Sequence, residues 1–454
     1  MLATILNAFK VAEIRKKLAF TALLLALYRL GSYIPVPGVS TDALKQIENN
    51  YAGSNILGFL NLFTGGGLSR IALFALGIMP YITASIILQL LVVVSPALEK
   101  LQKEGEVGQA RITQYTRYLT VGLAGAQAVG YTFLFRSQGS AGGEPVFTNF
   151  NAGTVILVVL CLTAGSILVM WMGELITQRG IGNGISLMIF ASIVAGLPGG
   201  VSQWWNTPDP VFKIIMPFLA IGVVAAVVFI QEGQRRIPIQ YAKRVIGRRM
   251  SSGGQTYLPL RVNMAGVIPV IFAASIMAFP PTLGQLIPGL EGLATFFNPG
   301  GWAYVLGETI MIVIFTYFYT AVTFNPVDQA DNLKKYGGFI PGIRPGRATS
   351  DYIDNVLTRI TLIGALYLVV VALIPEFLMM GVKVQGIPWV GPWLDAHLPN
   401  FITQGFGTPF YFGGTSLLIV VGVAMDTVQQ VESQLVMRNY DGFLKKGRIR
   451  GRCA

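Results

Sequence analysis

The sequence predicts an all-α membrane protein with ten transmembrane helices, and three observations lead to this prediction. The 454-residue chain is 53% hydrophobic and only 12% charged, about half the charged fraction of a typical soluble domain. Its mean hydropathy is +0.60. Apolar runs of about 20 residues, the length that crosses a bilayer as a helix, recur along nearly the whole chain and leave no room for a soluble domain.

The ten expected spans are separated by polar or glycine-rich segments. Gly180, Gly182 and Gly184 crowd the start of the fifth span, which is therefore the least clearly defined. The spans lie near residues 18–34, 72–95, 116–136, 152–173, 181–199, 211–231, 263–287, 302–324, 356–380 and 411–431.

The distribution of Lys and Arg between the loops predicts the orientation. Of the 33 basic residues, 27 fall on the side that carries both chain ends and five on the opposite side, while Arg29 lies within the first span. Because basic residues concentrate in cytoplasmic loops, both termini are expected in the cytoplasm.

Ten spans divide into five and five at a break near Pro198–Pro210. We expect an N-terminal half at residues 1–200, a C-terminal half at 201–431 and a basic cytoplasmic tail at 432–454. An odd number of spans in each half implies that two similar halves are inverted relative to each other in the membrane, as in many transporters.

Residues typical of catalysis or of metal binding are scarce. The chain has two cysteines, Cys161 in an apolar span and Cys453 in the tail, and one histidine, His397 in a loop. Their number and spacing fit no metal site or disulfide framework. Gly180–Gly184 opens a membrane span and follows no strand, so it fails the context that a nucleotide-binding loop requires. We therefore expect no enzyme activity, no cofactor and no bound metal.

A short apolar stretch at residues 55–64 precedes the second span and is followed by Gly65, Gly66 and Gly67. It is too short to cross a bilayer, and three glycines in a row favour a hinge. One interpretation is a re-entrant half-helix inside a vestibule, because irregular backbone at membrane depth needs protein or water around it. The alternative is an ordinary external loop with an interfacial helix.

Ionisable residues within the spans lie towards their ends rather than at their centres. Arg29, Glu308 and Glu376 are expected near the external side, and Glu174 and Asp426 near the cytoplasmic side. The alternative function is an ion-coupled secondary transporter, which usually needs a charged group at the midplane. The absence of a charged residue from the span centres weighs against a transporter.

Isoleucines occupy the middle of two spans in pairs four residues apart, at Ile82 and Ile86 and at Ile185 and Ile189. This spacing places each pair on one helix face. Packing or lipid contact accounts for such pairs. The alternative is a hydrophobic constriction, which closes a pore by excluding water.

Two basic cytoplasmic loops, at residues 232–262 and 325–355, are long for a helical bundle. The β-branched and aromatic run Ile237–Tyr241, followed by basic residues and a glycine-rich turn, predicts a protruding hairpin. Loops of this kind could bind RNA phosphates, an acidic protein or anionic lipid. Topology-setting charge alone explains their sign but not their length.

Five segments, found in the same order along the chain, resemble the SecY family of protein-conducting channels, of the bacterial or plastid type. The segments are residues 76–90 (LGIMPYITASIILQL), 179–186 (RGIGNGIS), 263–269 (NMAGVIP), 324–346 (FNPVDQADNLKK, then FIPGIRPG) and 413–420 (GGTSLLIV). Together they extend over nearly the whole chain.

The resemblance implies four groups of functional residues around a central pore closed by a short re-entrant plug helix at about residues 55–71. The pore ring is expected at Ile82, Ile86, Ile185, Ile189, Ile271 and Ile419. The plug contributes Leu60, Asn61, Phe63, Gly65, Gly66, Gly67 and Arg70. A lateral gate, where spans 2 and 3 face spans 7 and 8, includes the polar residues Ser85, Gln89 and Gln127, for which helix-packing hydrogen bonds are an equal alternative. Docking of the motor and the ribosome is expected at Arg248, Arg249 and Arg344.

The resemblance also implies a function and partners. The expected function is a passive channel that moves unfolded polypeptides across the membrane and releases hydrophobic segments sideways into lipid. The expected partners are the small membrane subunits SecE and SecG, the motor ATPase SecA, the ribosome with its RNA and proteins, precursor proteins with their signal peptides, and anionic lipids. The expected location is the bacterial inner membrane, with the thylakoid membrane as the alternative.

Overall fold

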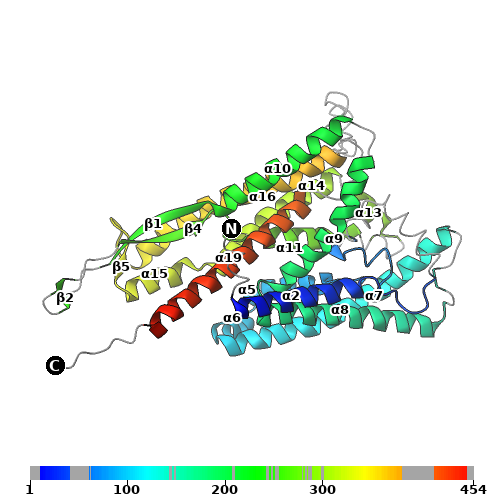
Figure 1. The fold of residues 1–454 in the computed structure, drawn as a ribbon, viewed down its shortest axis with the longest axis horizontal. Helices are drawn as coiled ribbons and strands as arrows, with labels where there is room; N and C mark the ends of the chain where they lie inside the picture. Colours follow the sequence, from blue (N-terminus) through cyan, green and yellow to red (C-terminus); the bar gives the residue numbers. More distant parts are fainter. Residues whose placement is uncertain are drawn as a thin grey trace. The chain divides into compact units, whose positions relative to one another are not determined.

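A computed structural model (Figure 1) describes most of the chain, and its helices and strands form two compact units. The described residues are 11–40, 61, 63–142, 146–147, 150–206, 210–241, 245–246, 249–250, 255–278, 280–281, 284, 289–297, 301–380 and 414–446. The first unit comprises Met1–Asn206, Ala278–Thr295 and Val423–Ala454, and the second comprises Thr207–Met277 and Phe296–Gly422.

Helices make up most of the first unit. They are α2 (Ala12–Gly31), α5 (Met79–Val94), α6 (Pro96–Lys103), α7 (Glu106–Gly142), α8 (Ala152–Arg179) and α9 (Gly184–Asn206), with most of the short α13 (Glu291–Phe296) and the later part of α19 (Gly414–Lys446). Helix α7 packs between α5 and α8, and α8 also contacts α9 and α2. Gly184 permits close packing, because a Cβ at this position would overlap the backbone of Gly173 on α8.

Two apolar clusters hold the first unit together. The larger one includes Leu68, Ile71, Phe135 and Leu162, so it joins the segment before α5 to α7 and α8. The smaller one places Ile181, from the connection between α8 and α9, against Ile14 of α2 and Val431 of α19.

The second unit combines helices with a small antiparallel sheet. Its helices are α10 (Pro210–Glu232), α11 (Ile268–Met277), α14 (Trp302–Thr323), α15 (Pro326–Lys335) and α16 (Arg347–Met380), with the start of α19. Its strands are β1 (Gln234–Tyr241), β2 (Val245–Ile246), β3 (Arg249–Met250), β4 (Gln255–Arg261) and β5 (Gly338–Phe339). Helix α14 packs against both α11 and α16.

A helix overlaps each of the ten predicted spans. Within the described residues, five helices are long and apolar enough to cross a bilayer, or six if the pair α5 and α6, bent by 99°, is counted as one span. These helices indicate a multi-pass membrane protein, while the number ten remains a prediction.

The boundaries of two spans differ from the prediction. Residues 72–78, expected in the second span, form turns and a bridge, and the helix begins only at Met79. The reason is local, because Gly77 has φ +55°, a left-handed conformation that interrupts a right-handed helix. The helix of the seventh span, α11 (Ile268–Met277), begins five residues later than the expected start at residue 263, and the described residues 280, 281 and 284 further along the span are also helical.

Candidate functional site

Residues 63–78 are named here the turn segment. Residues 63–71 of this segment belong to the predicted plug, and residues 72–78 were expected at the start of the second span. A plug helix was expected at about residues 55–71, but Thr64–Arg70 form turns, and among the described residues of this range only Asn61 and Phe63 are helical. Gly65 and Gly66 have φ values of +64° and +86°, and these values end the helix. The expectation of a helix through residue 71 is therefore wrong, and Leu60 lies outside the described residues.

Asn61 organises the turns that follow it. Its side-chain oxygen accepts a hydrogen bond from the Ser69 backbone N–H at 3.1 Å, and its side-chain nitrogen donates to Ser69 Oγ at 3.3 Å. The N–H of Gly66 donates to the Asn61 carbonyl at 2.9 Å. These local bonds satisfy backbone groups that neither a helix nor a sheet satisfies, as buried polar groups require.

Residues 71–73, named here the base of the turn segment, are attached to the residues that follow α2. The Val36 N–H donates to the Ile71 carbonyl at 3.0 Å, and the Leu73 N–H donates to the Ile34 carbonyl at 2.8 Å. Phe63, Leu68 and Ile71 are buried. The segment thus lies inside the first unit rather than on its surface, which weighs against an ordinary external loop.

Five of the six predicted pore-ring isoleucines are buried. Ile82 and Ile86 are each 2% exposed, Ile271 is 3% exposed, and Ile189 and Ile419 are fully buried, while Ile185 is half-buried. By contrast, Val94, on the same helix as Ile82, is 78% exposed. These isoleucines therefore face protein rather than lipid. They are distributed over both units, with α5 and α9 in the first and α11 and the start of α19 in the second.

Two of the three predicted gate residues contact each other. Gln89 Nε2 donates to Ser85 Oγ at 3.2 Å, one turn earlier on α5. Gln89 Oε1 is buried without a hydrogen-bond partner, which makes this end of the amide the polar atom available to a further contact. Gln127 is half-buried on α7, the helix that packs against α5.

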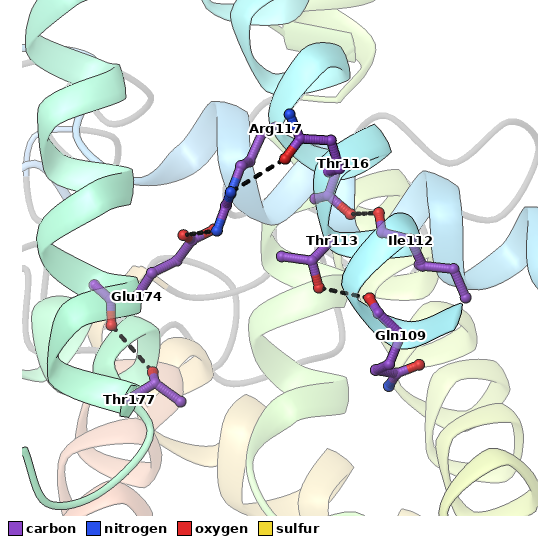
Figure 2. Close-up of polar contacts among 9 residues, drawn as sticks. Gln109, Ile112, Thr113, Thr116, Arg117, Glu174 and Thr177 are labelled. Atoms are coloured by element: carbon purple, nitrogen blue, oxygen red, sulfur yellow. Dashed lines mark hydrogen bonds and ion pairs between the residues drawn. The ribbon is translucent and has the colours of Figure 1, made fainter. Parts of the chain in front are cut away.

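A paired charge between α7 and α8 was missed by sequence reasoning, which noted Glu174 but not its partner (Figure 2). Arg117 Nε donates to Glu174 Oε1 at 3.1 Å, and Arg117 Nη2 donates to Oε2 at 2.7 Å. The second terminal nitrogen of Arg117 donates to Gln114 Oε1 at 3.2 Å. This two-bond geometry fixes orientation as well as distance, so the pair ties α7 to α8.

Strands from the two basic loops pair in one sheet of β1, β4 and β5. This sheet and helix α15 are together named here the basic platform. Strand β1 pairs with β4 in antiparallel register, so the predicted hairpin is confirmed. Strand β5, from the second loop, pairs with the other edge of β1 through Gln240 and Phe339. A cluster of buried isoleucines and leucines underlies the sheet and joins it to α16. Its buried members are Ile237, Leu260, Ile340, Ile353 and Ile360.

Arg344 lies exposed in a tight turn beside this platform. Gly342 and Gly346 on either side of it have φ values of +85° and +105°, conformations that glycine adopts without strain. The carbonyl of Arg344 accepts a hydrogen bond from Thr349 Oγ1 at 2.9 Å, at the start of α16. The turn therefore has a fixed backbone and an unburied guanidinium. Of the other two docking residues, Arg249 lies in β3 with its side chain outside the described part, and Arg248 lies outside it altogether.

Among the described residues, no group of three or more His, Cys, Asp or Glu side chains could hold a metal ion.

The fold is that of protein-conducting channels. A solved protein-conducting channel aligns with 96% of this chain and 94% of its own length, with a TM-score of 0.61 and 19% identity. A SecY structure whose plug domain is described as stabilising the closed channel aligns with a TM-score of 0.61 and 21% identity. Sec61 from the canine ribosome-channel complex of the endoplasmic reticulum aligns with a TM-score of 0.57 and 18% identity. The SecY and Sec61 structures each align with 96% of this chain and 94% of their own length.

Sequence comparison identifies the family. The SecY family model matches residues 72–428. The protein translocase subunit SecY of Streptomyces galbus is 46% identical, over 98% of this chain and the whole of that protein. The corresponding subunit of Mycobacterium bovis is 45% identical over the same shares. The chain belongs to the SecY family.

Proposed function

We propose that this chain is the pore-forming subunit of a protein translocase, a passive channel for unfolded polypeptides. The observation that carries the proposal is the burial of Ile82, Ile86, Ile189, Ile271 and Ile419 within apolar helices of a SecY-family chain. Aliphatic side chains carry no charge and offer no hydrogen-bond specificity, so they can close around any passing chain. A collar of such side chains excludes water and ions when no chain is present.

In this proposal residues 55–71, whose described part includes the start of the turn segment, are the plug of the resting channel. The burial of the turn segment and its attachment to residues 34–36 support a place inside the protein. The SecY relative whose plug domain is described as maintaining a membrane seal has the same fold.

Ser85, Gln89 and Gln127 are the proposed polar contacts of a lateral gate, through which hydrophobic segments leave for lipid. A signal peptide lodged there would gain about 25 cal/mol for each Å² of apolar surface that it buries. Its binding would shift the equilibrium from the closed to the open channel. The buried, unpartnered Oε1 of Gln89 supports this assignment, because such an atom gains free energy from a new hydrogen-bond donor.

The basic platform and the turn at Arg344 are the proposed docking site for a motor ATPase and for the ribosome. The exposed guanidinium on a fixed backbone supports this role, since arginine binds phosphate and carboxylate groups through two parallel hydrogen bonds. Sec61, which has the same fold, occurs in a ribosome-channel complex. Arg248 and Arg249 are proposed to contribute at the tip of the hairpin.

The proposed location is the bacterial inner membrane, with both termini in the cytoplasm, and the proposed partners are SecE, SecG, SecA, the ribosome, precursor proteins and anionic lipids. The positive-inside distribution of Lys and Arg supports this orientation. Two five-helix halves, 1–200 and 201–431, followed by the tail 432–454, remain the proposed organisation.

Reconstitution into lipid vesicles tests the proposed function. With the partner subunits, the ATP-driven motor and ATP present, an unfolded precursor should cross and become protected from protease, and it should not cross without this chain. Replacing Ile419 with Asn should hydrate the collar and increase ion leakage, whereas Ile419→Leu, which keeps the site apolar, should not. Uptake of a small solute coupled to an ion gradient, with no precursor transport, would instead favour a secondary transporter.

A further inference from the structure

Arg29, in the last turn of α2, reaches the turn segment through its side chain. Its Nη1 donates to the Gly65 carbonyl at 2.7 Å. Its Nη2 donates to Tyr33 Oη at 3.3 Å, and its guanidinium carbon lies 5.3 Å from the centre of the Tyr33 ring. The short bond from a charged donor to a carbonyl belongs to the stronger class of protein hydrogen bonds. The contact therefore carries more free energy than the neutral bonds within the segment.

The end of α2 that carries Arg29 is itself held rigidly. Tyr28 is buried, and its hydroxyl lies 2.7 Å from Ser192 Oγ on α9 in a hydrogen bond. The Tyr28 ring stacks on Phe74, with centroids 5.9 Å apart and ring planes 10° from parallel. A Cβ at Gly31 would overlap the Phe74 ring, so glycine is needed there for this packing. The Arg29 side chain therefore projects from a rigid helix end.

Gly65 lies close to Ser192 of α9. Its φ is +64°, and a Cβ at this position would lie 2.5 Å from Arg29 Nη1 and 3.3 Å from Ser192 Cα. Ser192 is three residues after Ile189, so both lie on one face of α9. The tip of the turn segment therefore sits about one helical turn from a proposed collar isoleucine, within the first unit.

The base of the turn segment, at residues 71–73, and its tip, at Gly65, are attached by different means. The base is joined to residues 34–36 by main-chain hydrogen bonds, which no side-chain rotation breaks. The tip is joined to α2 through the side chain of Arg29, which can leave by changing rotamer. Arg70, on the segment, also stacks on Tyr33, with its guanidinium carbon 4.3 Å from the ring centre.

We infer that Arg29 is a positioning residue that latches the tip of the plug against α9 in the resting channel. The base of the segment acts as the fixed end, and release of the Gly65 carbonyl by Arg29 frees the tip to move away from the collar. This inference rests on the proposed function, because it assigns the latch for the plug of that same channel.

The test measures ion leakage through the resting channel in planar bilayers and export of a precursor with a defective signal peptide. The test variant is Arg29→Gln, and the matched control is Arg136→Gln, an arginine that also stacks on an aromatic ring, with its guanidinium carbon 4.2 Å from the Phe150 ring centre. A lost charged hydrogen bond shifts a two-state equilibrium by about tenfold or more. We expect Arg29→Gln to raise leakage about tenfold and to admit the defective precursor, Arg29→Lys to have an intermediate effect, and Arg136→Gln to behave like the parent.

Two further variants separate the possible outcomes. Gly65→Ala attacks the same contact from the plug side, so it should also raise leakage, even if Arg29→Gln assembles poorly. Deletion of residues 61–70 serves as the reference for an absent plug. If the deletion leaks while both Arg29→Gln and Gly65→Ala stay within twofold of the parent, the latch is wrong and the proposed channel stands. If the deletion does not leak either, the plug of the proposed function is wrong as well.

Discussion

In the basic platform, regular strand pairing runs from Gln234–Arg261 to Gln240–Gln255, and one apolar cluster underlies it. The turn segment contributes Leu68 and Ile71 to an apolar cluster, but it has no comparable ladder, and the polar contacts of its tip are bonds within the segment and the bond from Arg29. Cooperative strand pairing over a core opens only at high free energy, whereas irregular segments with local bonds open at low free energy. The comparison teaches that the proposed docking surface and the proposed plug are built by different kinds of contact.

The difference is also visible in the way each region uses glycine. Beside the platform, Gly342 and Gly346 shape one exposed turn. The Arg344 carbonyl in this turn accepts a hydrogen bond from the Thr349 side chain. In the turn segment, Gly65 lies against both Arg29 and α9, and its φ of +64° strains any larger residue. Gly342 and Gly346 beside the platform therefore serve a turn, and Gly65 allows the turn segment to approach α9 closely.

The largest effect is expected from removing the core of the platform. Ile353 is fully buried under the sheet, and truncation of a buried isoleucine to alanine costs about 2–5 kcal/mol. Ile353→Ala should make loops 232–262 and 325–355 sensitive to protease, without raising ion leakage. The matched control is Ile363→Ala on the exposed face of α16, which should change neither. Leakage that rose together with protease sensitivity would contradict the separation of the two regions.

Charge reversal at Arg344 should follow in size. The proposed bonds from its guanidinium to the motor belong to the charged class, worth about 1.5–3 kcal/mol, so Arg344→Glu should lower motor-driven export about tenfold or more. The level of the channel in the membrane should not change, since the side chain is exposed. Arg347→Glu carries the same change of charge three residues away and is the control. Equal export by the two variants would remove Arg344 from the docking site.

The base of the turn segment should tolerate less change than its tip. A Cβ at Gly165 of α8 would overlap the carbonyl of Leu73, which is backbone and cannot rotate away. Overpacking of this kind costs about 1–3 kcal/mol, so Gly165→Ala should lower the thermal stability of the purified channel. Gly153, on the same helix, has open space around it, and Gly153→Ala should leave stability unchanged or raise it by about 0.5–1 kcal/mol, because alanine favours the helix. A stable Gly165→Ala protein would show that the base is as adaptable as the tip.

What could be predicted from the sequence was set by local pattern. Long apolar runs indicated the helices, and the β-branched run Ile237–Tyr241 indicated the hairpin. The predicted start of the second span was wrong because Leu73–Ile78 is as apolar as a helix, while the Leu73 N–H donates to the Ile34 carbonyl and the N–H groups of Ala75 and Gly77 donate within local turns. Contacts between distant residues carry no such local signal, and the missed ones include the pairing of β5 with β1 and the Arg117–Glu174 pair.

The candidate site shows the same limit. The isoleucines of the proposed collar could be named from spacing and resemblance, and most of them are buried. Arg29 was noted only for its place near the end of a span. Its partner is the main-chain carbonyl of Gly65, and no residue type in the sequence marks a carbonyl as a binding partner.

The smallest effect is expected at Tyr33, which both Arg29 and Arg70 contact through its ring. A cation–π contact at a site partly open to solvent is worth about 0.5–1 kcal/mol, less than the bond from Arg29 to the Gly65 carbonyl. Tyr33→Leu should therefore raise leakage through the resting channel by about twofold to fivefold, below the effect of Arg29→Gln. Tyr33→Phe keeps the ring and loses only the 3.3 Å hydrogen bond to its hydroxyl, so it should lie between Tyr33→Leu and the parent. If Tyr33→Leu leaked as much as Arg29→Gln, the ring rather than the carbonyl bond would be the main attachment of the plug tip.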